Sequence, residues 1–206
     1  MKSTRQIIVL LALGVLLIGG CAKPPAEQIE AAERAVRDAQ QGGAATYVAE
    51  EYAKLEGNLA ALKKEVSDQD GKFALFRDYG KAEQLAASAK AEGERVKAEA
   101  AKKKEEAKTA ALQAQQVAQE AVKSTLELVA KAPAGKDRAA LEAIKTDVEA
   151  LNASLNQVQS ALDKEDFPAA QTQARAIHEK SQAISAEIEQ ALTKIGKKKP
   201  SPPRAK

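Results

Sequence analysis

The side chain best suited to chemistry in this sequence is the thiol of Cys21, the only cysteine among 206 residues. A single thiol cannot form a disulfide within the chain, and no cluster of cysteines or histidines accompanies it as in a zinc site. It follows the stretch VLLIGG, at the end of an apolar run and directly after two glycines. Redox or metal chemistry is therefore disfavoured, and the preceding residues must indicate what else this thiol does.

Residues 1–20 have the pattern of a secretory signal peptide. Lys2 and Arg5 form a positive start, and the stretch IIVLLALGVLLI contains no polar side chain. Its 12 residues are too few to span a bilayer, which needs about 20, but they suit the apolar centre of a signal peptide. The alternative is an ordinary signal peptide followed by a cysteine at that place by chance.

The end of this segment resembles the lipobox of bacterial lipoproteins, and the residues that carry the resemblance are Ile18, Gly19, Gly20 and Cys21. The resemblance implies diacylglycerol on the Cys21 sulfur, cleavage before Cys21 and acylation, for example by palmitate, of the new terminus. Residues 21–25 would then be the lipidated cysteine and a spacer. Two or three acyl chains anchor a protein almost permanently. Because Ala22 and not aspartate follows, enterobacterial-type sorting rules imply the outer membrane, with the chain facing the periplasm.

The composition after the signal segment predicts an all-α fold. Aromatic residues make up 3% of the chain, charged residues make up 30%, and tryptophan is absent. Such a chain cannot build a broad globular core. Alanine, glutamate, lysine, glutamine and leucine are good helix formers, and no alternating strand pattern is present. We therefore expect long antiparallel helices that pair as helical hairpins or as a coiled-coil bundle.

Glycine and proline clusters divide this helical sequence. We expect helices over residues 26–41, 46–77, 81–131, 138–164 and 169–195, with Thr46 as an N-cap. The loop APAGKD separates an N-terminal Ala-rich region, 26–131, from a C-terminal hairpin, 137–195. Residues 196–206 lack periodicity and should form a disordered basic tail.

Apolar residues recur every three or four positions, which places them on one face of each helix. The long third helix differs because its stripe consists of small residues, which let a partner helix approach closely but bury little area each. The stripe is Ala82, Ala86, Ala89, Gly93, Val96, Ala100, Lys103, Ala107, Ala110, Ala114, Val117 and Ala121.

The stripes also align with one another, which predicts two duplicated hairpins. At one constant shift, Tyr52, Leu55, Leu59, Leu62, Val66 and Phe73 match Leu141, Ile144, Val148, Leu151, Leu155 and Leu162. One residue out of that register, Asp78-Tyr79-Gly80 matches Asp166-Phe167-Pro168. The shared turn is stronger evidence than the stripes, because heptad-like sequences align with themselves easily.

No enzyme or cofactor is expected from the remaining residues. His178 is the only histidine, and a general base would need a cleft and an orienting partner; a solvated histidine on a helix surface is the simpler interpretation. The carboxylates are scattered along polar faces, and no glycine-rich phosphate loop follows a strand. Nucleic-acid binding is disfavoured by export and by the lack of interleaved aromatic residues.

The stretch from Ala31 to Val66 resembles helical envelope lipoproteins that carry an Ala-rich domain of unknown function. The residues that match its pattern are Tyr52, Ala53, Leu59, Asp78, Ala82 and Ala86. The resemblance implies a helical fold and provides no catalytic residues. In plan the chain is also similar to the major murein lipoprotein, which has a lipidated cysteine, an alanine-containing heptad helix and a terminal lysine joined to peptidoglycan. That similarity makes Lys206 a candidate for attachment to peptidoglycan.

The tail contains basic residues and no acidic ones: Lys197, Lys198, Lys199, Arg204 and Lys206. Such a tail can touch peptidoglycan or another anionic envelope polymer, although solubility alone also explains it. Together these features predict an outer-membrane lipoprotein with a structural, tethering or scaffolding role. The alternative is a periplasmic adaptor that binds an envelope protein, or a second copy of itself, along the small-residue groove of the third helix.

Overall fold

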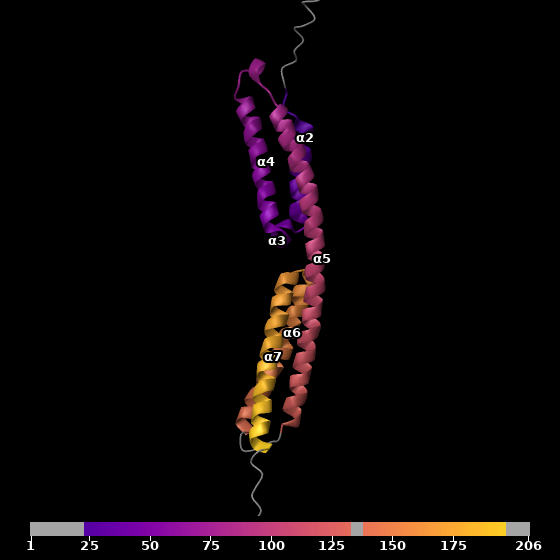
Figure 1. Ribbon diagram of the computed structural model, residues 1–206, viewed down its shortest axis with the longest axis vertical. Helices are drawn as coiled ribbons and strands as arrows, with labels where there is room; N and C mark the ends of the chain where they lie inside the picture. The colour runs from indigo at the N-terminus through magenta and orange to yellow at the C-terminus, as the bar shows by residue number, and fades with distance from the viewer. Residues whose placement is uncertain (1–22, 133–137, 197–206) are drawn as a thin grey trace, which may run out of the picture. The chain divides into compact units, whose positions relative to one another are not determined.

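A computed structural model describes residues 23–132 and 138–196 (Figure 1). Within these ranges every regular element is helical, which confirms the predicted all-α fold. In chain order the elements are α2 (Ala26–Gln41), α3 (Ala44–Tyr47), α4 (Ala49–Asp70), the 3₁₀ turn η2 (Ala74–Phe76), α5 (Gly80–Lys131), α6 (Arg138–Asp163) and α7 (Phe167–Gly196).

The chain folds into two packing units, and the boundary between them falls inside α5, between Lys102 and Lys103. Unit 1 contains α2, α3, α4, η2 and the first part of α5, while unit 2 contains the rest of α5 together with α6 and α7. The sequence division into 26–131 and 137–195 assigned all of α5 to the first part. Glycine and proline mark where a chain turns, and a helix that passes without interruption from one unit into the next carries no such mark.

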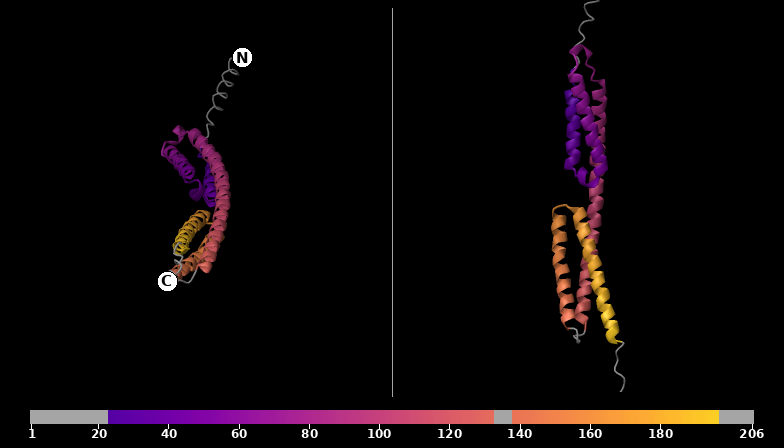
Figure 2. Two further views of the ribbon diagram at one scale, coloured as in Figure 1. Left: turned by 60° about the horizontal axis from the view of Figure 1, so that its bottom comes forward. Right: turned by 90° about the vertical axis from the view of Figure 1, so that its left-hand side faces the viewer.

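In unit 1 the helix α4 runs antiparallel to α5. The residue pairs that join them are Asn58–Glu92, Glu65–Lys81 and, just before α5, Asp70–Tyr79. Residues later in α4 therefore pair with residues earlier in α5. By contrast, α2 runs parallel to α5, since Asp38 pairs with Lys97 while Ala35, earlier in α2, meets the earlier Gly93. The three helices lie side by side in both views of unit 1 (Figures 1 and 2).

The contact between α2 and α5 depends on small side chains. A Cβ atom placed on Gly93 would lie 2.8 Å from the Cβ of Ala35 and 3.0 Å from its carbonyl carbon. The first half of the predicted stripe is therefore confirmed as a buried seam, which consists of Ala82, Ala86, Ala89, Gly93, Val96 and Ala100. Leu55 and Leu62 of α4 are fully buried against this seam and supply the larger side chains of the core.

The turn after α2 ends the helix at the predicted pair of glycines. Gly43 has a φ of 88°, a left-handed conformation that favours glycine, and its N–H donates to the carbonyl of Gln40. The chain then makes the single turn α3 before α4 begins after Val48, so the prediction that Thr46 caps one continuous helix is wrong. Burial of Ala44 and Val48 explains this extra turn, because it packs the connection onto the core.

Unit 2 repeats the same pattern of helix directions. Gln115 of α5 donates to Gln159 of α6, and Lys104, earlier in α5, pairs with Glu165, just after α6, so these two helices are antiparallel. The α7 helix is parallel to α5, since Ala110 and Gln171 line one pocket while Thr125, later in α5, donates to the main-chain oxygen of Ser181, later in α7, at 3.2 Å. The core residues that α6 and α7 contribute include Val148, Leu151, Val158, Leu162, Phe167, Ala170, Ala174, Ile177 and Ile188.

The turn that matched between the two halves of the sequence forms in both units. Tyr79 and Phe167 are both buried, and each follows an aspartate whose side chain caps the next helix. The Asp78 carboxylate accepts from the N–H of Gly80 at 2.9 Å, and the Asp166 carboxylate accepts from that of Ala169 at 3.2 Å.

Three sequence expectations need correction. The helix predicted over 46–77 ends at Asp70, and the helix predicted from Ala169 already begins at Phe167. The stripe of α5 is displaced by one residue in unit 2, where the buried positions are Ala111, Ala118, Val122, Thr125 and Val129 and not Ala110, Val117 and Ala121. A strict heptad has 3.5 residues per turn, so it drifts around a helix of 3.6 residues per turn as the helix lengthens.

We predict that Gly93→Ala destabilises the protein by about 1–3 kcal/mol, because the added methyl group overpacks the contact with Ala35. Gly57 is a matched control, since a Cβ there meets no atom within 4 Å. Gly57→Ala should raise stability by about 0.5–1 kcal/mol. Urea unfolding followed by circular dichroism measures both changes. A Gly93→Ala variant with unchanged stability would show that α2 and α5 do not approach so closely.

Candidate functional site

The residues that sequence analysis selected for chemistry lie outside the described part of the chain. This applies to Ile18, Gly19, Gly20 and Cys21 and to Lys206, so their roles remain predictions. The described chain starts at Lys23, two residues after Cys21. None of the described helices is both long and apolar enough to cross a bilayer.

The most unusual described surface is the loop between α4 and α5, Gly71–Tyr79, which we call the apolar loop. Phe73, Leu75 and Phe76 are 69%, 73% and 75% exposed, respectively. The two phenylalanine rings lie 6.2 Å apart between centroids. The chain has only three phenylalanines, and two of them are presented to solvent here, within η2 and directly before it.

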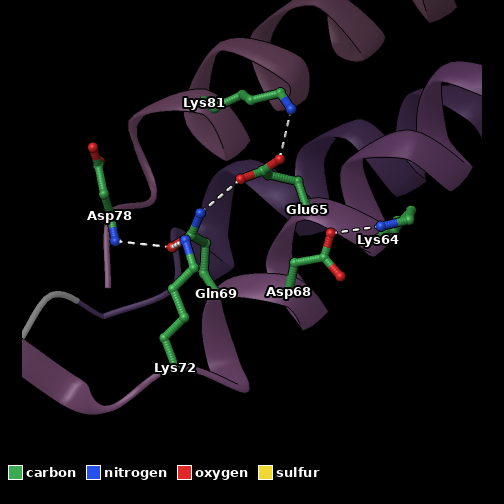
Figure 3. Close-up of polar contacts among 7 residues, drawn as sticks. All are labelled: Lys64, Glu65, Asp68, Gln69, Lys72, Asp78 and Lys81. Carbon is green, nitrogen blue, oxygen red and sulfur yellow. Dashed lines mark hydrogen bonds and ion pairs between the residues drawn. The ribbon is translucent and has the colours of Figure 1, made fainter. Parts of the chain in front are cut away.

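A buried side-chain amide binds residues at both ends of the apolar loop (Figure 3). Gln69, at the end of α4, is only 7% exposed. Its side-chain oxygen accepts from the N–H of Asp78 at 3.1 Å and from the Lys72 ammonium at 2.9 Å. Its side-chain nitrogen donates to the Glu65 carboxylate at 2.8 Å, and the other oxygen of Glu65 pairs with Lys81 of α5 at 2.8 Å. This amide thus joins both ends of the loop to the last turns of α4.

Arg77 and Tyr79 bind the end of the loop to the residues at its start. The Arg77 guanidinium donates to the main-chain oxygen of Lys72 at 3.0 Å and to that of Asp70 at 2.8 Å. The Tyr79 hydroxyl donates to the Asp70 carboxylate, while the ring is buried in the core of unit 1. Polar contacts therefore hold the backbone in place, and the exposed apolar side chains project from an ordered loop.

The hydrogen bonds of this network also shift two pKa values. The hydrogen bonds from Lys81 and Gln69 lower the pKa of Glu65 below its ordinary value of 4.5. The hydrogen bond to Asp70 and the burial of the ring raise the pKa of Tyr79. At neutral pH both shifts favour the observed pairing, because Glu65 remains a charged acceptor and Tyr79 remains a donor.

The apolar loop lies at the same end of unit 1 as the start of α2 (Figure 1). Ile29 and Ala32, in the first two turns of α2, pack in one cluster with Tyr79 and Ala82. The first described residues of the chain therefore enter the bundle beside this loop.

A second surface feature is a groove between α5 and α7 in unit 2, with a volume of about 510 Å³. It is lined in part by Thr125, His178, Ser181 and Ser185. The sequence predicted a solvated His178, but this side chain is half-buried. Neither its Nδ1 nor the hydroxyl of the fully buried Ser181 has a hydrogen-bond partner in the described structure. The described residues contain no group of three or more histidine, cysteine, aspartate or glutamate side chains that could hold a metal ion.

The described chain is thus a helical-bundle protein made of two units with three long helices each, and it has one ordered and exposed apolar loop. No protein-family model, curated protein or solved structure matches it. Sequence analysis missed the apolar loop because Phe73 continues the spacing of the α4 stripe. The available signal was the density of large apolar residues in KFALF directly after Gly71, a helix-ending residue type.

We predict that Glu65→Gln lowers stability at neutral pH and that its difference from the original protein shrinks on acidification. Because the folded-state pKa of Glu65 is lowered, its contribution is present above its ordinary pKa and is lost as the pH falls through the lowered value. Urea unfolding at a series of pH values below 7 measures the difference. Glu149→Gln, at an exposed position in α6, is the control. A pH-independent difference for Glu65→Gln would contradict the assignment.

Proposed function

We propose that this protein is a lipoprotein anchored through Cys21 in the outer membrane, with its helical units in the periplasm and a structural role in the cell envelope. The observation that carries the proposal is the order of the N-terminal residues. A positive start, an apolar run and Ile18-Gly19-Gly20 precede the only thiol, and the spacer Pro24-Pro25 and the first helix follow within five residues.

The construction of the two units supports a structural rather than a catalytic role. The cores are narrow seams between long helices, in which α5 contributes mainly alanine and valine, and the helix α5 contributes to both units without interruption. Long helices packed along narrow seams suit a spacer or scaffold, which needs rigid helical units more than a cleft. Its far partner would be peptidoglycan or another anionic polymer, bound by the basic tail or joined covalently through Lys206.

One observation favours the alternative of an adaptor. The groove between α5 and α7 is lined by Ala121 and Val117 of the predicted small-residue stripe, and Val117 is 45% exposed. A helix of an envelope protein could pack there against small side chains and satisfy the buried hydroxyl of Ser181. The tether remains the main proposal, because the groove alone does not indicate what occupies it.

We predict that radiolabelled palmitate enters the protein in growing bacteria and that Cys21→Ser abolishes the incorporation. The Cys21→Ser protein should also leave the outer-membrane fraction, since it loses the acyl chains that hold it there. Membrane fractionation with immunoblotting measures the distribution. Lys23→Ala is the control and should retain both label and location. Label that persists in Cys21→Ser would remove the basis of the proposal.

We also predict that the tether yields adducts with the cell wall. Digestion of purified peptidoglycan should release a muropeptide linked to Lys206, or crosslinking in intact cells should join the basic tail to the wall. Mass spectrometry identifies either product. Lys206→Arg should remove the muropeptide linked to Lys206 and leave the crosslink of the basic tail. One dominant crosslink to an envelope protein through the groove between α5 and α7 would instead establish the adaptor.

A further inference from the structure

The exposure of the apolar loop is specific to unit 1. The turn between α6 and α7 in unit 2 consists of Lys164, Glu165 and Asp166, which carry no apolar side chain. In the sequence alignment Leu162 is the counterpart of Phe73, yet Leu162 is 9% exposed and Phe73 is 69% exposed. In unit 1 the helix α4 ends at Asp70, and the loop that follows exposes these apolar residues.

The place of the loop within unit 1 indicates what covers it. Residues 22–25 separate Cys21 from the start of α2, and a chain step extends at most about 3.5 Å. The first residue of α2 therefore lies within roughly 17 Å of the Cys21 backbone, whatever path the spacer takes. Because the apolar loop lies at this same end of unit 1, an acylated Cys21 would hold the loop close to the surface of the bilayer.

The chemistry of the loop fits a lipid surface. Phenylalanine and leucine partition into the boundary between headgroups and acyl chains. The acidic residues around the loop are engaged within the protein: Asp68 pairs with Lys64, Asp70 accepts from Tyr79, and Asp78 caps α5. Lys72 and Arg77 flank the apolar side chains in the sequence and place positive charge beside them, while Lys72 donates to the Gln69 amide and Arg77 donates to main-chain oxygens. Even when fully exposed, the three side chains offer roughly 500 Å², whereas each partner in a stable protein interface buries about 800 Å².

We propose that the apolar loop is a second membrane contact, in which Phe73, Leu75 and Phe76 insert into the leaflet that carries the acyl chains of Cys21. This inference rests on the lipidation proposed above. The acyl chains supply permanent attachment, and the loop holds the adjoining end of unit 1 against the bilayer surface.

Tryptophan fluorescence tests the insertion directly, because the natural chain contains no tryptophan. The Leu75→Trp variant places a single reporter in the loop and retains both phenylalanines. The lipidated full-length protein is reconstituted in vesicles of phosphatidylethanolamine and phosphatidylglycerol, with or without lipids brominated near the headgroup end of the acyl chains. We expect bromolipids to reduce the Leu75→Trp emission by at least twofold.

The matched control is Ala45→Trp, at an exposed position beside Gly43 at the other end of the α2 and α4 helices. Its emission should be unaffected by bromolipids. A double variant, Phe73→Ser with Phe76→Ser, in the Leu75→Trp background should lose most of the quenching, and circular dichroism checks that all variants remain folded.

The outcomes separate this inference from the proposed function. Mass spectrometry of the purified protein reports acylation of Cys21 independently of the fluorescence. Acylated protein whose Leu75→Trp emission is not quenched would overturn the inference and leave the lipoprotein proposal standing. A blue-shifted emission that depends on protein concentration and not on bromolipids would show that a second copy covers the loop, which also overturns the inference. Protein without acyl groups would contradict the proposed function, and quenching in that protein would still support insertion.

Discussion

Close approach of helix backbones is the constraint on which this structure depends. Alanine buries little apolar area, so a seam of alanines stabilises a bundle only if the backbones come near enough for every methyl group to make dense contacts. Gly93 and Ala35 provide that approach in unit 1, where even one additional Cβ would fall 2.8 Å from its neighbour. In unit 2 the contact between α5 and α7 passes through Thr125 and Ser181, both almost fully buried. There the hydrogen bond from Thr125 to the main-chain oxygen of Ser181 contributes stability that the small side chains do not provide.

Narrow seams leave the ends of a bundle exposed, and the two units close their hairpin ends differently. In unit 2 the α6 helix continues to Asp163 and buries Leu162 before a short turn. In unit 1 the α4 helix ends at Asp70. Arg77 donates to the main-chain oxygens of Asp70 and Lys72, and the Gln69 side chain accepts from the N–H of Asp78. Satisfaction of buried or half-buried polar groups is what permits such a loop to remain ordered. The polar network and the outward position of Phe73 are therefore consequences of one event, the early end of α4.

Much of the fold could be predicted from composition and spacing, because helix formers, glycine pairs and apolar stripes act locally. The bounds of α2 and the end of α5 at Lys131 follow from such signals. The end of α4 was harder to predict, since Phe73 continues an apolar stripe and the tertiary contacts of Gln69 and Tyr79 decide where the helix stops. The buried face of α5 in unit 2 was also hard to predict. The sequence after Ala100 has small or apolar residues on two adjacent faces, and packing against α6 and α7 decides which face is buried. The lipobox residues and Lys206 lie outside the described chain, so that part of the site is still a prediction.

As the proposed second membrane contact, the apolar loop would matter for orientation more than for attachment. Full burial of one phenylalanine or leucine side chain contributes about 1.5–3 kcal/mol, which is small beside two or three acyl chains that already hold a protein permanently. If Cys21 is acylated as proposed, the loop would be kept at a high local concentration next to the bilayer, so even a weak contact would be formed most of the time. A single attachment at Cys21 would let unit 1 tilt freely about its short spacer. A second contact at the same end, made by side chains on an ordered loop, restricts that tilt, and a tether or scaffold needs a defined direction away from the membrane.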